Sequence, residues 1–101
     1  MNRTEILRAL REHAPELRAC GVAGASLFGS VARGEASAQD IDIAVRLDTH
    51  FSAPGLDYIG RLDQLQARLS ALLGCKVDVV EEPVRKPRLQ SEIDRDRALV
   101  F

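Results

Sequence analysis

The sequence predicts an α/β fold with one mixed sheet of three to four strands and helices packed on it. Three observations support this class. Apolar runs of strand length alternate along the chain with longer stretches of helical periodicity. The turn between the first two expected strands is too short for a crossover, so these strands are expected to pair antiparallel. A long helix precedes the third strand, and its length allows a right-handed crossover to a parallel neighbour.

The first helical pattern lies within residues 1–20, with apolar side chains at Ile6, Leu7, Leu10, Ala14 and Leu17. Asn2, followed by Glu5 three residues later, resembles a capping box that starts a helix. Pro15 has no N–H to donate, so we expect the helix to break or restart there. Gly21 is expected to end the segment.

Two strands of different character follow. The stretch "VAGASLF", residues 22–28, indicates a short buried strand that ends at Gly29. Ser30 is a preferred N-cap residue, so a short helix is expected to open there. The stretch "DIDIAVRL", residues 40–47, alternates in the way that is typical of a strand with two different faces. One face is aliphatic, and the other carries Asp40, Asp42, Ala44 and Arg46.

The second half of the chain begins with a long amphipathic helix over residues 56–73, ended by Gly74. Its apolar stripe consists of Leu56, Ile59, Leu62, Leu65, Leu69, Leu72 and Leu73. The stretch "KVDVVEE" predicts a third strand, on which Asp78 faces away from Val77 and Val79. Residues 89–94 are expected to form a final helix, and "ALVF" a last short strand.

Composition limits the possible functions. The chain has 101 residues, 46% of them hydrophobic, and a formal net charge of −1. These values are typical of a single globular domain, expected over residues 1–101, without a global field that attracts nucleic acid or membrane. No run approaches the roughly 18 apolar residues of a membrane span, and no secretory signal is recognisable. Cys20 and Cys75 lack metal-ligand spacing and are expected to be reduced, so a cytoplasmic protein is predicted.

Two carboxylates in an apolar strand need a physical explanation, because burying a charge is costly unless it is paired or binds a metal. In an antiparallel pair, the end of the first strand meets the start of the second, which brings Gly29 and Ser30 to Asp40 and Asp42. A neighbouring third strand would add Asp78 on the same face. Carboxylate oxygens suit Mg²⁺, and a Gly-Ser turn offers N–H groups and a hydroxyl to phosphate oxygens. The combination predicts a site for magnesium and phosphate.

Each part of this pattern is weak evidence by itself. An Asp-x-Asp pair on a strand often faces water, and a lone Gly-Ser pair is common. The GxxxxGK[ST] sequence of a P-loop does not occur, and neither does the ligand series of an EF-hand. The hypothesis therefore depends on the combination of the turn, the pair of aspartates and the third aspartate.

The stretch "LFGSVARGEASAQDIDIAV", with the later "KVDVV", resembles the nucleotidyltransferase domains of the DNA polymerase beta superfamily. Within that superfamily the chain is similar to the minimal nucleotidyltransferase (MNT) proteins, a branch that the "ARGE" extension favours. The resemblance covers nearly the whole chain and implies the polymerase beta-like fold. Gln39 is a departure, since many relatives have serine or another small polar residue there. It precedes the expected metal ligands and is not expected to abolish catalysis.

The resemblance implies a role for each matching residue. Asp40 and Asp42 would hold Mg²⁺, expected as two ions. Asp78 would complete the second metal site and help to deprotonate the attacking hydroxyl. Gly29 and Ser30 would hold the triphosphate of the nucleotide. The reaction implied is the transfer of AMP from ATP to a hydroxyl, with release of pyrophosphate.

Three further residues have two interpretations each. Arg33 is expected to contact the nucleotide, with a structural salt bridge to the acidic cluster as the alternative. Arg46 lies on the aspartate face of its strand, where it could meet the nucleotide or a partner, or end in solvent. Phe51 could rim the nucleotide pocket or anchor a partner.

The acceptor of the nucleotide is expected on another molecule, because only 23 residues follow Asp78. The resemblance implies a HEPN-family ribonuclease toxin as the partner, with AMP attached to one of its tyrosines and this chain acting as antitoxin. Two alternatives stay open. The acceptor could be a small molecule such as an aminoglycoside, or the chain could neutralise its partner by binding alone. Direct binding to nucleic acid or to a membrane is not expected.

Overall fold

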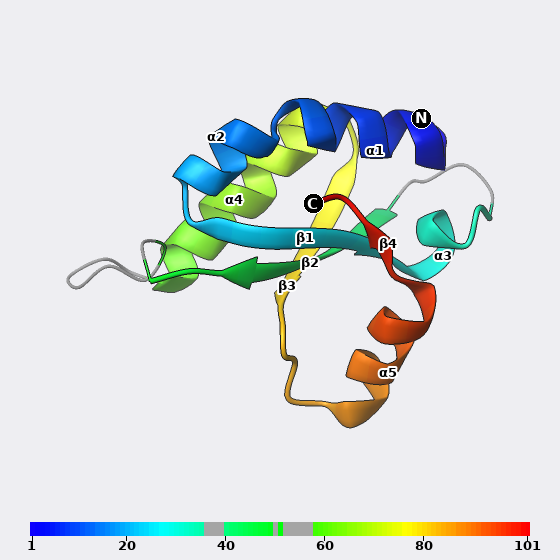
Figure 1. Cartoon of the computed structure of the whole chain (residues 1–101). Helices are drawn as coiled ribbons and strands as arrows, with labels where there is room; N and C mark the ends of the chain where they lie inside the picture. The colour runs from blue at the N-terminus through cyan, green and yellow to red at the C-terminus, as the bar shows by residue number, and fades with distance from the viewer. Residues whose placement is uncertain (36–39, 50, 52–57) are drawn as a thin grey trace.

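The computed structural model describes residues 1–35, 40–49, 51 and 58–101. The strands of the described residues form one four-stranded mixed sheet in the order β3-β2-β1-β4 (Figure 1). β1 (Val22–Phe28) pairs antiparallel with β2 (Asp40–Leu47) and, at its other edge, with β4 (Ala98–Leu99). β3 (Lys76–Glu81) pairs parallel with β2. The predicted α/β class and the predicted strand directions are confirmed.

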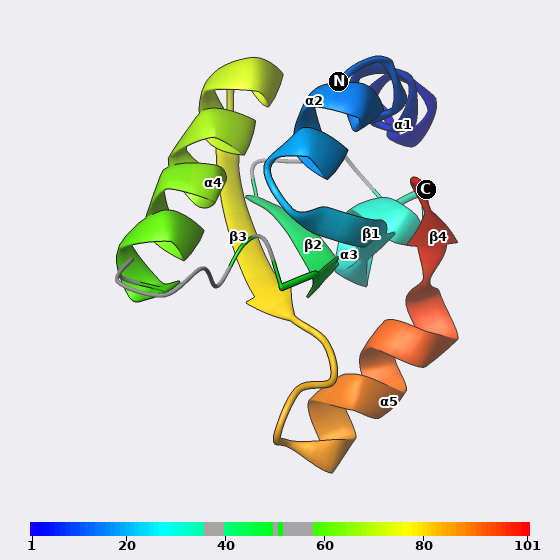
Figure 2. The same cartoon turned by 60° about the vertical axis from the view of Figure 1, so that its left-hand side comes forward.

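The main core lies between one face of the sheet and a layer formed by α1 (Arg3–Glu12), α2 (Ala14–Ala19) and α4 (Tyr58–Leu73) (Figures 1 and 2). The aliphatic face of β2 points into this layer, because successive side chains on a strand alternate between its two sides. The side chains buried most completely here include Ile6, Leu10, Leu27, Ile41, Ile43, Val45 and Val77. The opposite face of β2, which carries the aspartates, therefore points away from the main core.

The first helix starts, and the second restarts, at the residues that the sequence predicted. The Asn2 side chain accepts a hydrogen bond of 2.9 Å from the Glu5 N–H, which caps α1. α1 ends at Glu12, and α2 restarts at Ala14 with Pro15 in its first turn, where an N–H is not needed. None of the helices in the described parts of the chain is long and apolar enough to cross a membrane.

The first turn of α4 differs from the predicted apolar stripe. Leu65, Leu69 and Leu73 are buried as expected, but Ile59 is 68% exposed. Tyr58 takes the inward direction instead, since its hydroxyl donates a hydrogen bond to Glu81 on β3. Adjacent residues on a helix point about 100° apart, so Ile59 is turned outward. The predicted start of this helix at residue 56 lies outside the described residues.

Phe51 belongs to the main core, with only 2% of its surface exposed. Its ring makes an edge-on contact with Tyr58, and the Arg61 guanidinium lies over it, 5.2 Å from the centroid. Gly21 makes the close approach possible, because a Cβ at this position would lie 2.6 Å from the Phe51 nitrogen. Neither interpretation of Phe51 as a pocket rim or a partner anchor fits this burial.

The opposite face of the sheet is covered by α5 (Pro87–Asp96), shown in orange in Figure 1. A smaller core forms there from Phe28, Ala44 and Ile93, with Val80, Val84 and Leu89 packed against it. The final helix predicted over residues 89–94 is confirmed and is longer at both ends. α5 thus covers the face of the sheet that carries Asp42 and Asp78.

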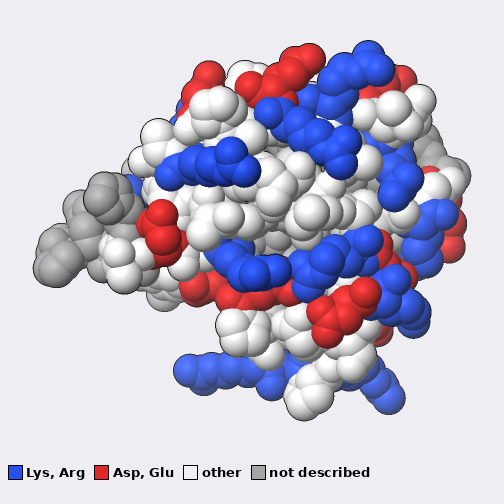
Figure 3. All heavy atoms as spheres, in the orientation of Figure 1, with Lys and Arg blue, Asp and Glu red and all other residues white. Residues whose placement is uncertain are grey.

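Arginines protect the sheet edge formed by β4. Arg11 donates hydrogen bonds to the carbonyl oxygens of Val100 and Leu99, at 3.2 and 2.9 Å. The Arg18 guanidinium lies 4.7 Å from the centroid of the Phe101 ring. Figure 3 shows basic side chains spread over this side of the molecule. Charged side chains beside an edge strand discourage pairing with other chains, which suits a strand of only two residues.

Candidate active site

The structure brings the three predicted aspartates to one end of the sheet. Asp42 and Asp78 are register partners on the parallel strands β2 and β3, so their side chains leave the sheet on the same face. Neighbouring strands are about 4.8 Å apart, which makes these two carboxylates close neighbours. Asp40 precedes Asp42 by two residues on the same face of β2 and is exposed to solvent. The structure thus places Asp42 beside Asp78, with Asp40 on the same face of β2.

The electrostatics of Asp42 reflect this arrangement. Its side chain is only partly accessible, and burial raises the pKa of its carboxyl above the ordinary value. The negative charges of Asp78 and Asp40 raise this pKa further, because ionised Asp42 is repelled by both. A cation placed among these groups would relieve the repulsion, which is the property expected of a metal site.

Mg²⁺ fits this donor set if the carboxylates supply only some of its ligands. Within the described residues, no three Asp, Glu, His or Cys side chains lie close enough together to hold a metal ion by themselves. Mg²⁺ does not need one, because it is usually held by one or two carboxylates together with waters and substrate phosphates. Asp42 and Asp78, the adjacent pair, therefore match an ion whose other ligands come from a nucleotide and water.

The end of β1 turns directly over Asp42. Phe28 is the register partner of Asp42, and Gly29 follows with φ +76°, a conformation that residues with a Cβ rarely adopt. A Cβ on Gly29 would lie 2.6 Å from Oδ2 of Asp42. Glycine is needed here both for the turn and for the approach of the backbone to the carboxylate.

Ser30 does not cap a helix, contrary to the prediction. α3 (Gly29–Ala32) begins one residue earlier, Phe28 occupies the N-cap position in an extended conformation, and no side chain caps the helix. The positive φ of Gly29 makes the turn, which leaves Ser30 inside the helix, next to the residue that touches Asp42. The role of Ser30 in the site stays a prediction.

Replacement of Gly29 by alanine tests this close approach. Gly34 provides a matched control, since its φ of +75° is nearly the same and a Cβ there would meet nothing within 4 Å. Gly34→Ala is expected to cost about 1–2 kcal/mol for the backbone conformation alone. Gly29→Ala is expected to cost about 1–3 kcal/mol more, because the methyl group displaces Asp42. Urea unfolding of both variants measures the difference, and equal losses would contradict the close approach.

Arg33, the C-cap residue of α3, is paired with carboxylates outside the aspartate cluster. Its Nη1 donates to Oδ2 of Asp96 at 2.7 Å, and its Nε donates to Oε1 of Glu35 at 3.0 Å. The hydrogen bonds to Glu35 and Asp96 raise the pKa of the guanidinium, which stays charged. Arg33 therefore forms the structural salt bridge that was considered as its alternative role. Its partners are Glu35 and Asp96 instead of the aspartates of the cluster.

A family model described as the nucleotidyltransferase domain matches residues 4–99, a range that contains every residue of this cluster. The chain belongs to the nucleotidyltransferase domain family. Comparison with curated proteins found no match.

Solved structures extend this nucleotidyltransferase assignment. A protein assigned as a minimal nucleotidyltransferase is 34% identical with a TM-score of 0.72, over 97% of this chain and 95% of that one. A toxin–antitoxin structure with AMP-PNP contains a chain that is 26% identical with a TM-score of 0.64, over 100% and 73%. A complex of tri-AMPylated Shewanella oneidensis HEPN toxin with MNT antitoxin contains one that is 26% identical with a TM-score of 0.58, over 99% and 69%.

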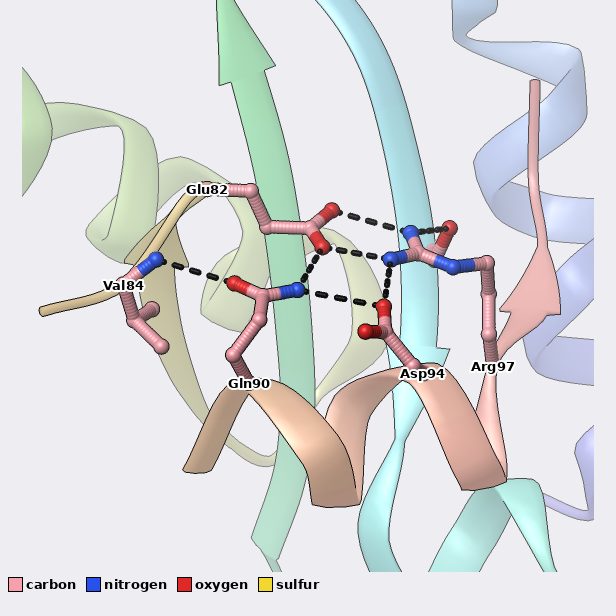
Figure 4. Close-up of polar contacts among 6 residues, drawn as sticks. Glu82, Val84, Gln90, Asp94 and Arg97 are labelled. Carbon is pink, nitrogen blue, oxygen red and sulfur yellow. Dashed lines mark hydrogen bonds and ion pairs between the residues drawn. The ribbon is translucent and has the colours of Figure 1, made fainter. Parts of the chain in front are cut away.

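The nucleotidyltransferase domain contains a partly buried polar network that sequence reasoning missed (Figure 4). Glu82, directly after β3, is only 9% exposed and accepts a hydrogen bond of 2.9 Å from Nη1 of Arg97. The same nitrogen donates to the hydroxyl of Ser26 on β1, which is 1% exposed. Gln90 of α5 donates to Glu82 at 2.9 Å, and Asp94 accepts from both Gln90 and Arg97. The network fastens α5 and the start of β4 to the sheet.

The sequence contained one signal for this network. Alternate residues of a strand share a face, so Glu82 is expected on the same face as Asp78 and Val80 if the alternation of β3 continues past its end. This is the face that α5 covers. Arg46 lies near this end of the face, where its charge contributes to lowering the pKa of Glu82. Arg46 is exposed, which agrees with the interpretation that its side chain ends in solvent.

The pH dependence of stability tests the Glu82 pair in this nucleotidyltransferase domain. The hydrogen bond from Arg97 lowers the pKa of Glu82 below its ordinary value, and Gln90 contributes in the same direction. The unfolded chain then binds the proton more tightly, so this contribution is present above about pH 4.3 and is lost as the pH falls below it. The stability advantage of wild type over Glu82→Gln should therefore shrink between pH 5 and pH 3. Urea unfolding across this range measures it, and a constant difference would contradict the ionised pair.

Proposed function

We propose that this chain is a Mg²⁺-dependent adenylyltransferase that moves AMP from ATP to a tyrosine hydroxyl of a HEPN-family toxin and thereby acts as an antitoxin. One observation carries the proposal. Asp42 and Asp78 occupy the same register position on parallel strands, and Gly29 packs against Asp42 at the start of α3. This geometry suits an ion bound between carboxylates on one side and phosphate oxygens on the other.

Each residue of the cluster has a role in this proposal. Asp40 and Asp42 hold the metal, and Asp78 completes the set from β3 and accepts the proton of the attacking hydroxyl. Bound Mg²⁺ would neutralise the charge that develops on the transferring phosphate. Gly29 and Ser30 present backbone N–H groups and a hydroxyl to the triphosphate.

The reaction is a substitution at the α-phosphorus of ATP. The acceptor oxygen forms a bond to this phosphorus while the bond to the bridging oxygen of the β-phosphate breaks. The products are an AMP ester of the acceptor and pyrophosphate, and the proton of the hydroxyl passes to a carboxylate. Asp40 is exposed to solvent, so a macromolecular acceptor can approach the cluster from outside.

Two relatives support the choice of nucleotide and acceptor. One related toxin–antitoxin structure was determined with AMP-PNP, an analogue of ATP. In another, the HEPN toxin bound to the MNT antitoxin is tri-AMPylated. We transfer both properties to this chain as part of the proposal, with the number of AMP units as a quantity to be measured.

Intact-mass spectrometry of the HEPN partner tests the proposal. The partner is incubated with this chain, ATP and Mg²⁺, in parallel with the Asp40→Ala, Asp42→Ala variant. A gain of one or more AMP units with wild type, absent with the variant, supports transfer to protein. A stable complex without any mass gain would favour neutralisation by binding alone. Absence of a complex would direct the search to small hydroxylated acceptors such as aminoglycosides.

A further inference from the structure

The position of α3 depends on contacts with the rest of the protein. This helix has four residues, and so short a helix has no stability of its own. Val31 anchors it to the main core with 3% exposure, which fixes one side of the turn. The other fixed point is Arg33, which follows the last residue of α3 and forms ion pairs at this end.

Asp96 is a largely buried partner of Arg33. Its side chain is only 4% exposed, although it is the last residue of α5. It accepts hydrogen bonds from Nη1 of Arg33 at 2.7 Å and from Nε of Arg95 at 2.9 Å. The two arginines, Arg95 more than Arg33, hold the pKa of Asp96 below its usual range. The contact is therefore a charged pair that joins the end of α3 to the end of α5.

α5 provides a fixed support for this pair. Ile93 is completely buried against the sheet, and Gln90 is hydrogen bonded to both Glu82 and the N–H of Val84. Nε and Nη2 of Arg33 donate to the two carboxylate oxygens of Glu35. The guanidinium is thus engaged by carboxylates of its own chain on both sides.

We propose that Arg33 is a positioning residue, which through Asp96 fixes α3 and its Gly29–Ser30 turn relative to the aspartates. This inference rests on the proposed function, in which that turn receives the triphosphate. It assigns Arg33 a role different from the direct nucleotide contact that the sequence suggested. The two roles make opposite predictions for a change at Asp96.

Asp96→Asn separates the two roles. A phosphate-binding Arg33 would be released from its partner, so affinity for nucleotide would stay the same or rise. A positioning Arg33 would lose its anchor, and affinity for AMP-PNP with Mg²⁺ is expected to fall about 10-fold, as for the loss of one charged hydrogen bond. Calorimetric titration with AMP-PNP and Mg²⁺ measures this. Arg95→Ala is the matched control, because it removes the other arginine of Asp96 and leaves the Arg33 pair intact.

Amide hydrogen exchange gives a readout that does not depend on nucleotide. The N–H of Arg33 donates to the Gly29 carbonyl and that of Glu35 to the Ser30 carbonyl, so both report on α3. Exchange at these two amides is expected to accelerate about 10-fold in Asp96→Asn and in Arg33→Gln. Arg33→Lys, which can keep a charged contact with Asp96, is expected to restore most of the protection. A side chain that only bound phosphate would leave exchange in the free protein unchanged.

The outcomes separate this inference from the proposed function. If wild type does not bind AMP-PNP, the proposed function fails, and the exchange rates alone decide whether Arg33 positions α3. If wild type binds, unchanged or tighter binding by Asp96→Asn with unchanged exchange overturns the inference. If Asp96→Asn does not fold, Arg33→Gln and Arg33→Lys supply the exchange comparison, in which unchanged exchange overturns the inference. Weaker binding together with faster exchange supports it.

Discussion

The double variant Asp40→Ala, Asp42→Ala is expected to lose AMP transfer by about 10³-fold or more. Loss of the proposed metal ligands would remove several kcal/mol of charge stabilisation from the transition state, and about 1.4 kcal/mol corresponds to a factor of ten in rate. The initial rate of mass gain on the HEPN partner, compared at equal enzyme concentration, measures the effect. Binding to the partner is expected to persist, because both substitutions lie at the aspartate cluster and outside the main core.

Complex formation by the double variant is the necessary control. Comigration of the variant with its partner in size-exclusion chromatography would show that lost transfer is not lost binding. Transfer within tenfold of the wild-type rate would contradict the assignment of these aspartates. Full neutralisation of the toxin by the inactive variant would show that catalysis is not needed for the proposed antitoxin role.

Asp42→Asn is expected to be more stable than wild type when metal is removed. The substitution relieves both the cost of a partly buried charge and its repulsion from Asp78 and Asp40. Gains of about 0.5–2 kcal/mol are common when an unfavourable functional residue is replaced. Thermal melting in EDTA measures the gain, and added Mg²⁺ should raise the melting temperature of wild type more than that of the variant. A variant less stable than wild type in EDTA would contradict the repulsion.

Glu82→Ala is expected to lower the free energy of unfolding by about 3 kcal/mol. The glutamate side chain is 6% exposed and that of Arg97 is 24% exposed, so removal of the acid leaves a largely buried cation that keeps only the exposed Asp94 as a carboxylate partner. For a domain of this size, such a loss lowers the melting temperature by about 12–24 °C. Calorimetry or circular dichroism during heating measures it.

A double-mutant cycle isolates the Glu82–Arg97 contact from general damage. The combination of Glu82→Ala with Arg97→Ala is expected to cost less than the sum of the two single variants, because neither buried charge is left alone. Asp94→Ala is the matched control, since Asp94 also binds Arg97 but is 61% exposed. Its loss is expected to stay below about 1 kcal/mol. Strictly additive losses in the cycle would contradict a coupled network.

These two sets of variants concern the same face of one sheet. The aspartate cluster lies where β2 and β3 begin, and Glu82 follows the residue at which β3 ends. Between these two positions α5 packs on the sheet, where its Ile93 forms a small core with Phe28 of β1 and Ala44 of β2. We therefore expect Glu82→Ala to reduce nucleotide transfer mainly by loss of folded protein, a loss that is reversed when the assay temperature is lowered.

The sequence by itself determined the strands and the face on which the aspartates lie. The expected strands over residues 22–28 and 40–47 match β1 and β2. The reason is local, because the alternation of a strand assigns each side chain to a face before any partner is known. The same alternation, continued on β3, was sufficient to place Asp78 beside Asp42 once the two strands were taken as neighbours.

Only the tertiary structure decided which distant groups meet. Arg33 pairs with Asp96 across 63 positions of sequence, and Arg97 with Ser26 across 71. In a chain with 14 basic and 15 acidic residues, local patterns cannot select one partner among many. The same limit applies to Ile59, which points outward because Tyr58 binds Glu81 on another element. Periodicity depends on neighbours in sequence, whereas ion pairs and burial depend on how the finished layers pack.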